Sequence, residues 1–430
     1  MYKIGVHRHH QECDNLGADV ADGIDANVLQ EFRTAAFCPI VCFFACHFFC
    51  GCKVTKNLSF FIFFHQMFVI SHPEPLLRGI KSSELMIKTI NSWRGLMAVT
   101  VVLFHAGVGW IWNIAVTGVT FFFISSTFLL ALHHPFDTLN AKKYKHFIIN
   151  HALRLYPLHW LGLLMLVPLI LSTNQSIDWG NFTLTTLLLQ AWSPVHEVHY
   201  AINPVTWYMC ALLFCYFAHP FIAHWMFHWG LRRRLLLAAS LALILAAILV
   251  PFDLPGREAI FVNPLSHIVD IPVGLTFVHL LALLKARYPR VGYGTATLIE
   301  VLTLLSLVVA IGLNLVTTWF KPWEDLLIWL IPQGSILIAM AFLDGQEGAI
   351  GRLLLTRPFQ WLGSISFEIY VLHYVTFYIF NYYLCPVAGH FGWMIYDKLA
   401  WFCLLLTLPM AWLFNRYFTE PVTAWLKRAL

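Results

Sequence analysis

The stretch "NSWRGLMAVTVVLFHAGVGW", Asn91 to Trp110, is an apolar run that carries Arg94 near its start and His105 further along. Eleven residues of α-helix turn three times, so the two side chains fall within about 20° of one another and about 16 Å apart. Such a face suits an anionic substrate that moves toward a proton-transfer group, since buried ionisable residues in lipid are costly and usually functional. The other interpretation is that Arg94 anchors the helix at the membrane surface and that His105 makes a structural hydrogen bond.

The whole chain is as apolar as this stretch. Of its 430 residues, 59% are hydrophobic and only 11% are charged, with 17 Trp and 36 Phe. A soluble domain does not tolerate this composition, so we expect a polytopic membrane protein whose partner is the lipid bilayer. The net charge of +5 gives no support to nucleic-acid binding.

Apolar runs of about 20 residues are long enough to cross a membrane as helices. The sequence therefore predicts an all-α transmembrane bundle of about ten spans. A shorter apolar piece at 182–192 predicts a re-entrant or interfacial helix. The predicted spans are 93–112, 114–132, 152–172, 203–228, 235–250, 260–284, 295–318, 326–343, 361–384 and 396–416.

Positive charges orient this bundle. With the start of the first span in the cytoplasm, the inner segments receive eighteen Lys and Arg residues and the outer segments receive only three. Cytoplasmic loops of membrane proteins carry this excess of positive charge. Both ends of the bundle are therefore predicted to be cytoplasmic.

Residues 1–85 differ from the rest of the chain. Six of the ten cysteines fall within the first 52 residues, and four of these lie in the Phe-rich run "CFFACHFFCGC" at 42–52, which has neither carboxylates nor a second paired-Cys unit. This pattern favours neither a disulfide scaffold nor a metal site. We expect residues 1–85 to be an extension that is not part of the native protein, and residues 86–430, from Met86, to be the working membrane domain.

Further ionisable residues lie at the depth of His105. Asp270, one helical turn after His267, and His373 each fall near the middle of a predicted span. Three helices would then offer ionisable side chains at one level of the membrane. Hydrogen bonds between helices are the structural alternative for each residue taken singly.

The third predicted span opens with "NHALRLYPLHW". His151 and Arg154 are three residues apart and share a helix face, with three lysines just upstream. Arginine binds phosphate oxygens through two parallel hydrogen bonds, so this cationic mouth suits a phosphate-bearing ligand. An ordinary cluster of cytoplasmic anchoring charges is the alternative.

Several of these motifs, in this order, resemble the acyltransferase 3 family. "INSWRGLMAVTVVLFHA" resembles the family's opening Arg, ten residues and His. "HALRLYPLHW" is similar to its third helix, although His151 replaces the first of two arginines. "GVTFFFISSTFLL" resembles its second helix, with Ser126 and Thr127 in place of Ser-Gly and Thr120 in place of Asp. "TWYMCALLFCYF", "SFEIYVLHY" and "YFTEPV" resemble later family segments.

The resemblance implies an O-acyltransferase of the inner (plasma) membrane. Such an enzyme transfers an acyl group, usually acetyl from acetyl-CoA, to a hydroxyl of a carbohydrate such as a surface polysaccharide or its lipid-linked precursor. It implies acyl-CoA as a co-substrate and no bound cofactor. The expected roles are catalysis for His105 and Arg94, donor binding for Arg154 and His151, and an acceptor-side or structural role for Trp207, Asp270, His373 and Ser126.

The same residues leave two other functions open. A membrane transporter would also place Arg, His and Asp at mid-membrane, but it usually shows internal repeats or paired broken helices. A polysaccharide polymerase would typically carry a long polar outer loop, whereas the longest outer loop expected here, 173–202, is mostly apolar. Direct transfer and an acyl-imidazole relay through His105 both remain possible, and the sequence does not define the oligomeric state.

Overall fold

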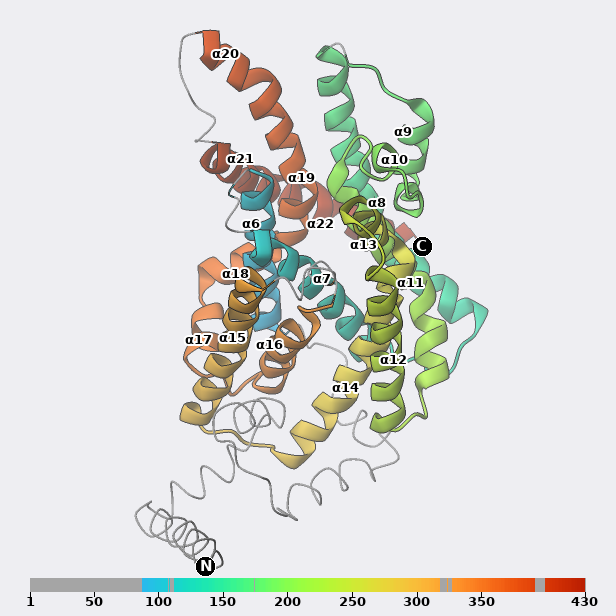
Figure 1. The fold of residues 1–430 in the computed structure, drawn as a ribbon, viewed down its shortest axis with the longest axis vertical. Helices are drawn as coiled ribbons and strands as arrows, with labels where there is room; N and C mark the ends of the chain where they lie inside the picture. The colour runs from blue at the N-terminus through green and yellow to red at the C-terminus, as the bar shows by residue number, and fades with distance from the viewer. Residues whose placement is uncertain are drawn as a thin grey trace, which may run out of the picture.

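The computed structural model describes residues 87–106, 108, 112–173, 175–317, 323, 327–390 and 399–429. Every regular element among these residues is a helix, which confirms the all-α prediction. The predicted extension at 1–85 lies outside the described residues. Figure 1 shows the helices as a bundle in which α8, α9, α19 and α20 lie toward one end of the long axis and α12 and α14 to α17 toward the other.

The α-helices, in chain order, are α6 (Lys88–His105), α7 (Trp112–His133), α8 (Ala141–Ser172), α9 (Trp179–Thr186), α10 (His196–His199), α11 (Trp207–Met226), α12 (Leu231–Leu249), α13 (Leu254–Val262), α14 (Asp270–Arg287), α15 (Tyr293–Val316), α16 (Leu330–Phe342), α17 (Ala349–Leu354), α18 (Arg357–Ser364), α19 (Ser366–Ile379), α20 (Cys385–His390), α21 (Leu399–Phe414) and α22 (Glu420–Ala429). Short 3₁₀ turns are η2 (Gln190–Trp192), η3 (Pro204–Thr206) and η4 (Pro264–Val269), and π-helical turns are η6 (Phe380–Leu384) and η8 (Asn415–Thr419).

A helix occupies part of every predicted span, but the helices differ in their ability to cross a membrane. Within the described residues, five are long and apolar enough, and α18 with α19 and its continuation makes a sixth if a pair bent by 67° counts as one span. The protein is therefore a multi-pass membrane protein. The count of about ten crossings and the cytoplasmic location of both ends remain predictions.

Local chemistry explains where the helices differ from the predicted spans. The span expected at 260–284 is broken, because Pro264 has no backbone N–H and Asn263 before it is extended, with its Oδ1 accepting from the N–H of Leu265 at 2.9 Å. Helix α8 begins earlier than expected, at Ala141, because the side chain of Asn140 before it accepts from the N–H of Lys143 at 2.8 Å and caps the helix. The predicted piece at 182–192 becomes α9 and η2, and the eight residues of α9 span only about 12 Å.

Helix α6 is held by close backbone approaches to its neighbours. A Cβ at Gly95 would lie 2.6 Å from the backbone nitrogen of Gly363 in α18, a distance that only glycine allows. Helices α7 and α14 cross in the same way, because a Cβ at Gly274 would lie 2.6 Å from the backbone carbon of Thr127. These crossings fix the helix that carries Arg94 and His105.

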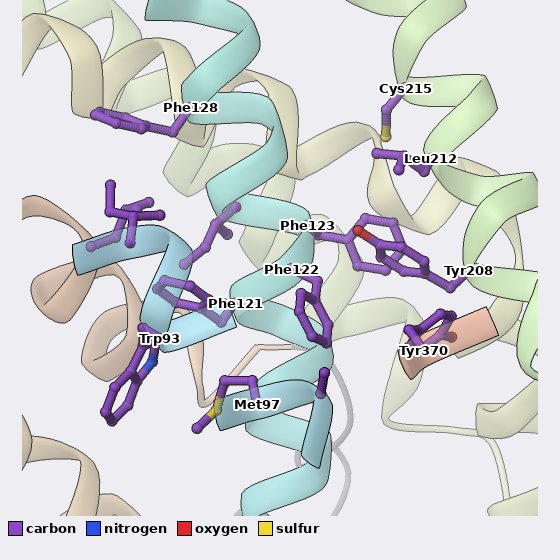
Figure 2. Close-up of a cluster of buried hydrophobic side chains, with 14 of the residues drawn as sticks. Trp93, Met97, Phe121, Phe122, Phe123, Phe128, Tyr208, Leu212, Cys215 and Tyr370 are labelled. Atoms are coloured by element: carbon purple, nitrogen blue, oxygen red, sulfur yellow. The ribbon is translucent and has the colours of Figure 1, made fainter. Parts of the chain in front are cut away.

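The core around α6 and α7 is aromatic and is tied by one buried amide. Figure 2 shows Trp93, Phe121, Phe122 and their neighbours packed between the helices. The indole Nε1 of Trp93 donates to Gln333 Oε1 at 3.3 Å, and Gln333 Nε2 donates to Thr117 Oγ1 at 2.9 Å. Buried polar atoms that are satisfied in this way set the register between helices.

Candidate active site

Helix α6 places Arg94 and His105 at different depths of the bundle. Its eighteen residues have no break, so the two side chains keep the common face and the rise of about 16 Å expected from the sequence. Trp93, Met97, Ala98 and Val101 are buried against the core, and Arg94 and His105 are each partly exposed. The helix therefore carries a positive charge, Arg94, near its start and an imidazole, His105, at its end.

His105 meets a second histidine from the other end of the chain. The ring centroids of His105 and His373 lie 5.1 Å apart, with an interplanar angle of 34°. Helix α19 packs against α6 and brings His373 to this position. The structure therefore forms a pair of imidazoles.

The hydrogen bonds of His373 fix its tautomer. Its Nδ1 lies 2.8 Å from the carbonyl oxygen of Tyr370 and 3.3 Å from that of Ile369, and carbonyls only accept, so Nδ1 carries the proton. Its Nε2 is buried and has no hydrogen-bond partner among the described residues. His373 thus keeps a bare lone pair beside His105, which is what a proton acceptor needs.

Arg94 lies in an aromatic environment at the other level of α6. Its guanidinium carbon is 6.0 Å from the centre of the Phe122 ring, and it interacts electrostatically with the phenol of Tyr208. Arg94 Nε is buried without a hydrogen-bond partner in the described part of the chain. Tyr208 in turn lies 3.5 Å from Ser126 Oγ, so Ser126 belongs with Arg94 in this structure.

Arg154 and His151 lie on the first half of α8, beside the Arg94 region. Arg154 is exposed and interacts electrostatically with Arg94 and with Glu368 of α19. Glu368 is buried and accepts a hydrogen bond from Asn415 Nδ2 at 3.0 Å. His151 Nδ1 donates to the Phe147 carbonyl at 2.8 Å. Arg154 therefore repels the charge of Arg94 and attracts that of Glu368.

The loop before α8 borders this cationic region. Lys143 Nζ donates to Asp137 Oδ1 at 3.0 Å, and this hydrogen bond holds the pKa of the exposed Asp137 carboxyl below its usual value. Lys143, one of the three lysines expected to line the cationic mouth, is therefore paired with a carboxylate. Lys142 and Lys145 remain exposed on the first turns of α8.

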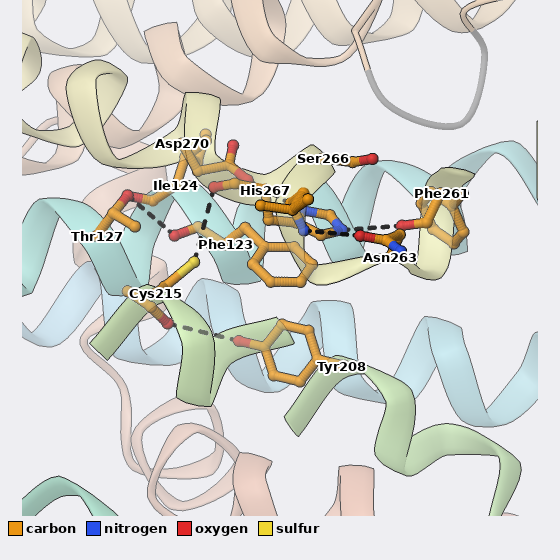
Figure 3. A network of polar contacts seen from close by, with 12 residues as sticks. Phe123, Ile124, Thr127, Tyr208, Cys215, Phe261, Asn263, Ser266, His267 and Asp270 are labelled. Atoms are coloured by element: carbon orange, nitrogen blue, oxygen red, sulfur yellow. Dashed lines mark hydrogen bonds and ion pairs between the residues drawn. The ribbon is translucent and has the colours of Figure 1, made fainter. Parts of the chain in front are cut away.

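Asp270 makes a closed pair with His267, as Figure 3 shows. His267 Nδ1 lies 3.0 Å from Asp270 Oδ2, and its Nε2 donates to the Phe261 carbonyl at 2.9 Å. The imidazole stacks on Phe123 with ring centroids 3.6 Å apart, and the Trp207 ring lies 6.0 Å from it. Both ring nitrogens are used, so the pair has no free nitrogen to act as a base.

The structure therefore divides the predicted site residues into three groups. His105 and His373 form one group. A second group holds Arg94, Ser126, Arg154 and His151. Trp207 and Asp270 belong to the third, with His267. Asp270 pairs with His267, whereas His373 lies beside His105, so the three ionisable residues expected at one level do not form one cluster. No three His, Cys, Asp or Glu side chains among the described residues are arranged to hold a metal ion.

Sequence reasoning missed two residues of the Arg94 region. Tyr208 follows Trp207 in an apolar helix and gave no signal of its own. Glu368 did give a signal in the sequence, because a carboxylate within an apolar run is rare and marks either a functional site or a paired charge.

Comparison with known proteins identifies the chain. The sequence model of a family described as an acyltransferase domain matches residues 87–418, which include every site residue above. No curated protein and no solved structure matches the chain. The family match agrees with the resemblance seen in the motifs of the sequence. The chain therefore belongs to the acyltransferase 3 family, and it is an acyltransferase with a multi-pass helical membrane domain.

Proposed function

We propose that the protein is an O-acyltransferase of the plasma membrane that transfers an acetyl group from acetyl-CoA to a hydroxyl of a carbohydrate, such as a surface polysaccharide or its lipid-linked precursor. The observation that carries the proposal is the pair of His105 on α6 and His373 on α19, together with Arg94, which lies about 16 Å from His105 along α6. The family match supports acyl transfer as the reaction.

The arginines support an acyl-CoA donor. Coenzyme A carries phosphates at one end and the thioester at the end of a long flexible arm. Arg94 and Arg154 supply two guanidinium groups for the phosphates, and the rise of about 16 Å along α6 separates Arg94 from His105. In this arrangement the donor lies along α6, with its thioester beside the imidazole pair.

The chemistry requires a base beside the thioester. The acceptor hydroxyl gives its proton to an imidazole, its oxygen bonds to the thioester carbon, and the carbon–sulfur bond breaks. The departing thiolate takes up the proton that the imidazole received, so charge and atoms balance. We assign His105 the role of this base, since it lies on α6 and makes no hydrogen bond among the described residues that would occupy its nitrogens.

A relay through an acyl-imidazole is the second form of the same function. There His105 attacks the thioester carbon, the carbon–sulfur bond breaks, and CoA leaves as the thiol with the proton that the acylated imidazole gives up. The hydroxyl oxygen then bonds to the acyl carbon while His373 Nε2 takes the hydroxyl proton, the acyl–nitrogen bond breaks, and the proton passes to the departing His105 nitrogen. The closeness of two imidazoles supports either form. Trapping of an acylated protein in the absence of acceptor would select the relay.

The test uses the full chain, reconstituted in lipid vesicles with radiolabelled acetyl-CoA and a glycoconjugate extract of the parent cell's membranes. We expect label in the carbohydrate fraction as an alkali-labile ester, together with stoichiometric release of free CoA. A protein that releases no CoA and labels no carbohydrate, yet moves a solute or changes polysaccharide chain length, would be a transporter or a polymerase and would contradict the proposal.

A further inference from the structure

Four buried side chains near the outer loop expected from the sequence share one unusual feature. Each makes one hydrogen bond as a donor and leaves its other polar atom without a partner in the described part of the chain. They come from α8, η2, α10 and the segment before η3, and all are at most 2% exposed. The four are His159, Gln190, His199 and Asn203, here called the acceptor-atom cluster.

The two histidines show the pattern clearly. His159 Nε2 donates to the Thr185 carbonyl at 2.9 Å, which leaves Nδ1 as a bare acceptor. His199 Nδ1 donates to the Ser193 carbonyl at 3.2 Å, which leaves Nε2 bare. Burial lowers the pKa of His199, which lies outside the membrane spans, and so favours the neutral ring with a free lone pair.

The two amides repeat it. Gln190 Nε2 donates to Thr206 Oγ1 at 3.1 Å, and Asn203 Nδ2 donates to the Val371 carbonyl at 3.4 Å. The amide oxygens of Gln190 and Asn203 have no partner among the described residues, and an amide oxygen can only accept a hydrogen bond. All four unpartnered atoms are therefore hydrogen-bond acceptors.

The cluster adjoins the imidazole pair. Asn203 bonds to Val371, two residues before His373 on α19, and Tyr370 OH donates to the Val205 carbonyl at 2.8 Å. A Cβ at Gly162, one turn after His159 on α8, would lie 3.6 Å from Asn203 Nδ2. His373 Nε2, on the same helix as Val371, is a fifth bare acceptor.

Buried polar atoms rarely lack a partner, and each one that does costs free energy unless water or a ligand satisfies it. Because all of these atoms are hydrogen-bond acceptors, a molecule that satisfies them must be rich in hydrogen-bond donors and must carry no negative charge. The hydroxyl groups of a sugar meet both conditions.

We propose that the acceptor-atom cluster binds the hydroxyl groups of the carbohydrate acceptor and directs one of them to the imidazole pair. The inference rests on the proposed function and names the site that its second substrate occupies. The four atoms are covered in the described conformation, so binding requires the segment from η2 to η3 to shift and the hydroxyls to replace any water held there.

Two substitutions displace the bare acceptor and retain the existing hydrogen bond, because the amide oxygen that each introduces does not occupy the position of the bare ring nitrogen. In His159→Gln the amide nitrogen takes the place of Nε2 and still reaches the Thr185 carbonyl, whereas in His199→Asn it takes the place of Nδ1. The matched control is His219→Gln, because His219 Nε2 donates to the His134 carbonyl at 3.3 Å, its Nδ1 is bare, and it lies on α11, which contributes no residue to the cluster.

The experiment measures acetyl transfer from radiolabelled acetyl-CoA by the full chain in lipid nanodiscs, with the membrane glycoconjugate extract in a dilution series. We expect each cluster variant to raise the KM for the extract about five- to tenfold, since one hydrogen bond is lost, and to leave the KM for acetyl-CoA unaltered. The control should leave both constants unaltered. If His159→Gln does not insert in membranes, Gln190→Met replaces it.

The outcomes separate this inference from the proposed function. Transfer by the wild type with an unaltered KM for the extract in both cluster variants would overturn the inference alone. An equal rise in both KM values would also overturn it, because general damage would explain the loss. Absence of transfer to the extract by the wild type would overturn the proposed function and this inference with it.

Discussion

His105 and His373 have ring centroids 5.1 Å apart although they belong to the first and one of the last helices of the described bundle. His373 is held by carbonyls of its own helix and offers a bare Nε2, while His105 ends α6. Rings at this separation can contact the same reacting group. The pair is therefore the most direct structural reason to place the chemistry at this end of α6.

Replacing His373 by Asn tests its part in the pair. Asn keeps an amide donor near the position of Nδ1 and removes Nε2. We expect kcat to fall about a hundredfold or more, because proton transfer by a positioned side chain contributes about 10² to 10⁴ in rate, while the KM for acetyl-CoA is retained. Steady-state transfer kinetics measure both constants, and a wild-type kcat would remove His373 from the mechanism.

Arg94→Gln tests the donor site. A charge-assisted hydrogen bond to phosphate contributes about 1.5–3 kcal/mol, so we expect the Kd for CoA to rise about ten- to a hundredfold. Titration calorimetry of the protein in nanodiscs gives the Kd. Arg233→Gln, an exposed arginine on the first turn of α12, is the control and should bind CoA as the wild type does. Equal losses in the two variants would indicate a general effect of charge.

Gly95→Ala tests the crossing that fixes α6. The new Cβ would lie 2.6 Å from the backbone nitrogen of Gly363, so the two helices must move apart, and we expect a loss of about 1–3 kcal/mol. Gly312→Ala in α15 is the control, because a Cβ there meets nothing within 4 Å and alanine favours a helix. Unfolding midpoints in detergent should fall for Gly95→Ala only, and a fall in both would contradict the packing argument.

Arg234 was counted among the inner positive charges of the predicted topology, but in the structure its side chain caps the end of α11. Its NH2 group donates to the carbonyls of Met226 at 2.7 Å and Phe227 at 3.0 Å, at the end of α11, and its Nε donates to Trp229 at 2.8 Å. Arg234→Met leaves these carbonyls unpaired, so we expect destabilisation of about 3 kcal/mol. Arg233→Met should change the unfolding midpoint little, and the same loss in both variants would refute the capping role.

Much of the fold follows from hydrophobic pattern alone. Runs of about 20 apolar residues predicted helices at each expected span, and Pro264 was a visible signal for the break before α14. The 67° bend at Ile365, between α18 and α19, depends on tertiary contacts such as Gly95 against Gly363, which no local pattern reveals.

The site was predictable to a smaller extent. Periodicity placed Arg94 and His105 on one face, and the continuous α6 retains it. The neighbours of that face depend on which helices pack together, so the sequence did not distinguish His373, beside His105, from Asp270, paired with His267. Bare acceptor atoms such as Asn203 Oδ1 become visible only when every hydrogen bond is assigned.

The central claim is that His105 performs acyl transfer. The most direct test compares His105→Asn with His279→Asn in transfer of radiolabelled acetyl from acetyl-CoA to the membrane extract. His279 is a buried histidine of α14 whose two ring nitrogens have no hydrogen-bond partner among the described residues, so its replacement breaks no hydrogen bond. Both variants should unfold at the temperature of the wild type. We predict that His105→Asn loses at least about a hundredfold in transfer rate and that His279→Asn keeps the wild-type rate. Equal rates in the two variants would contradict the account.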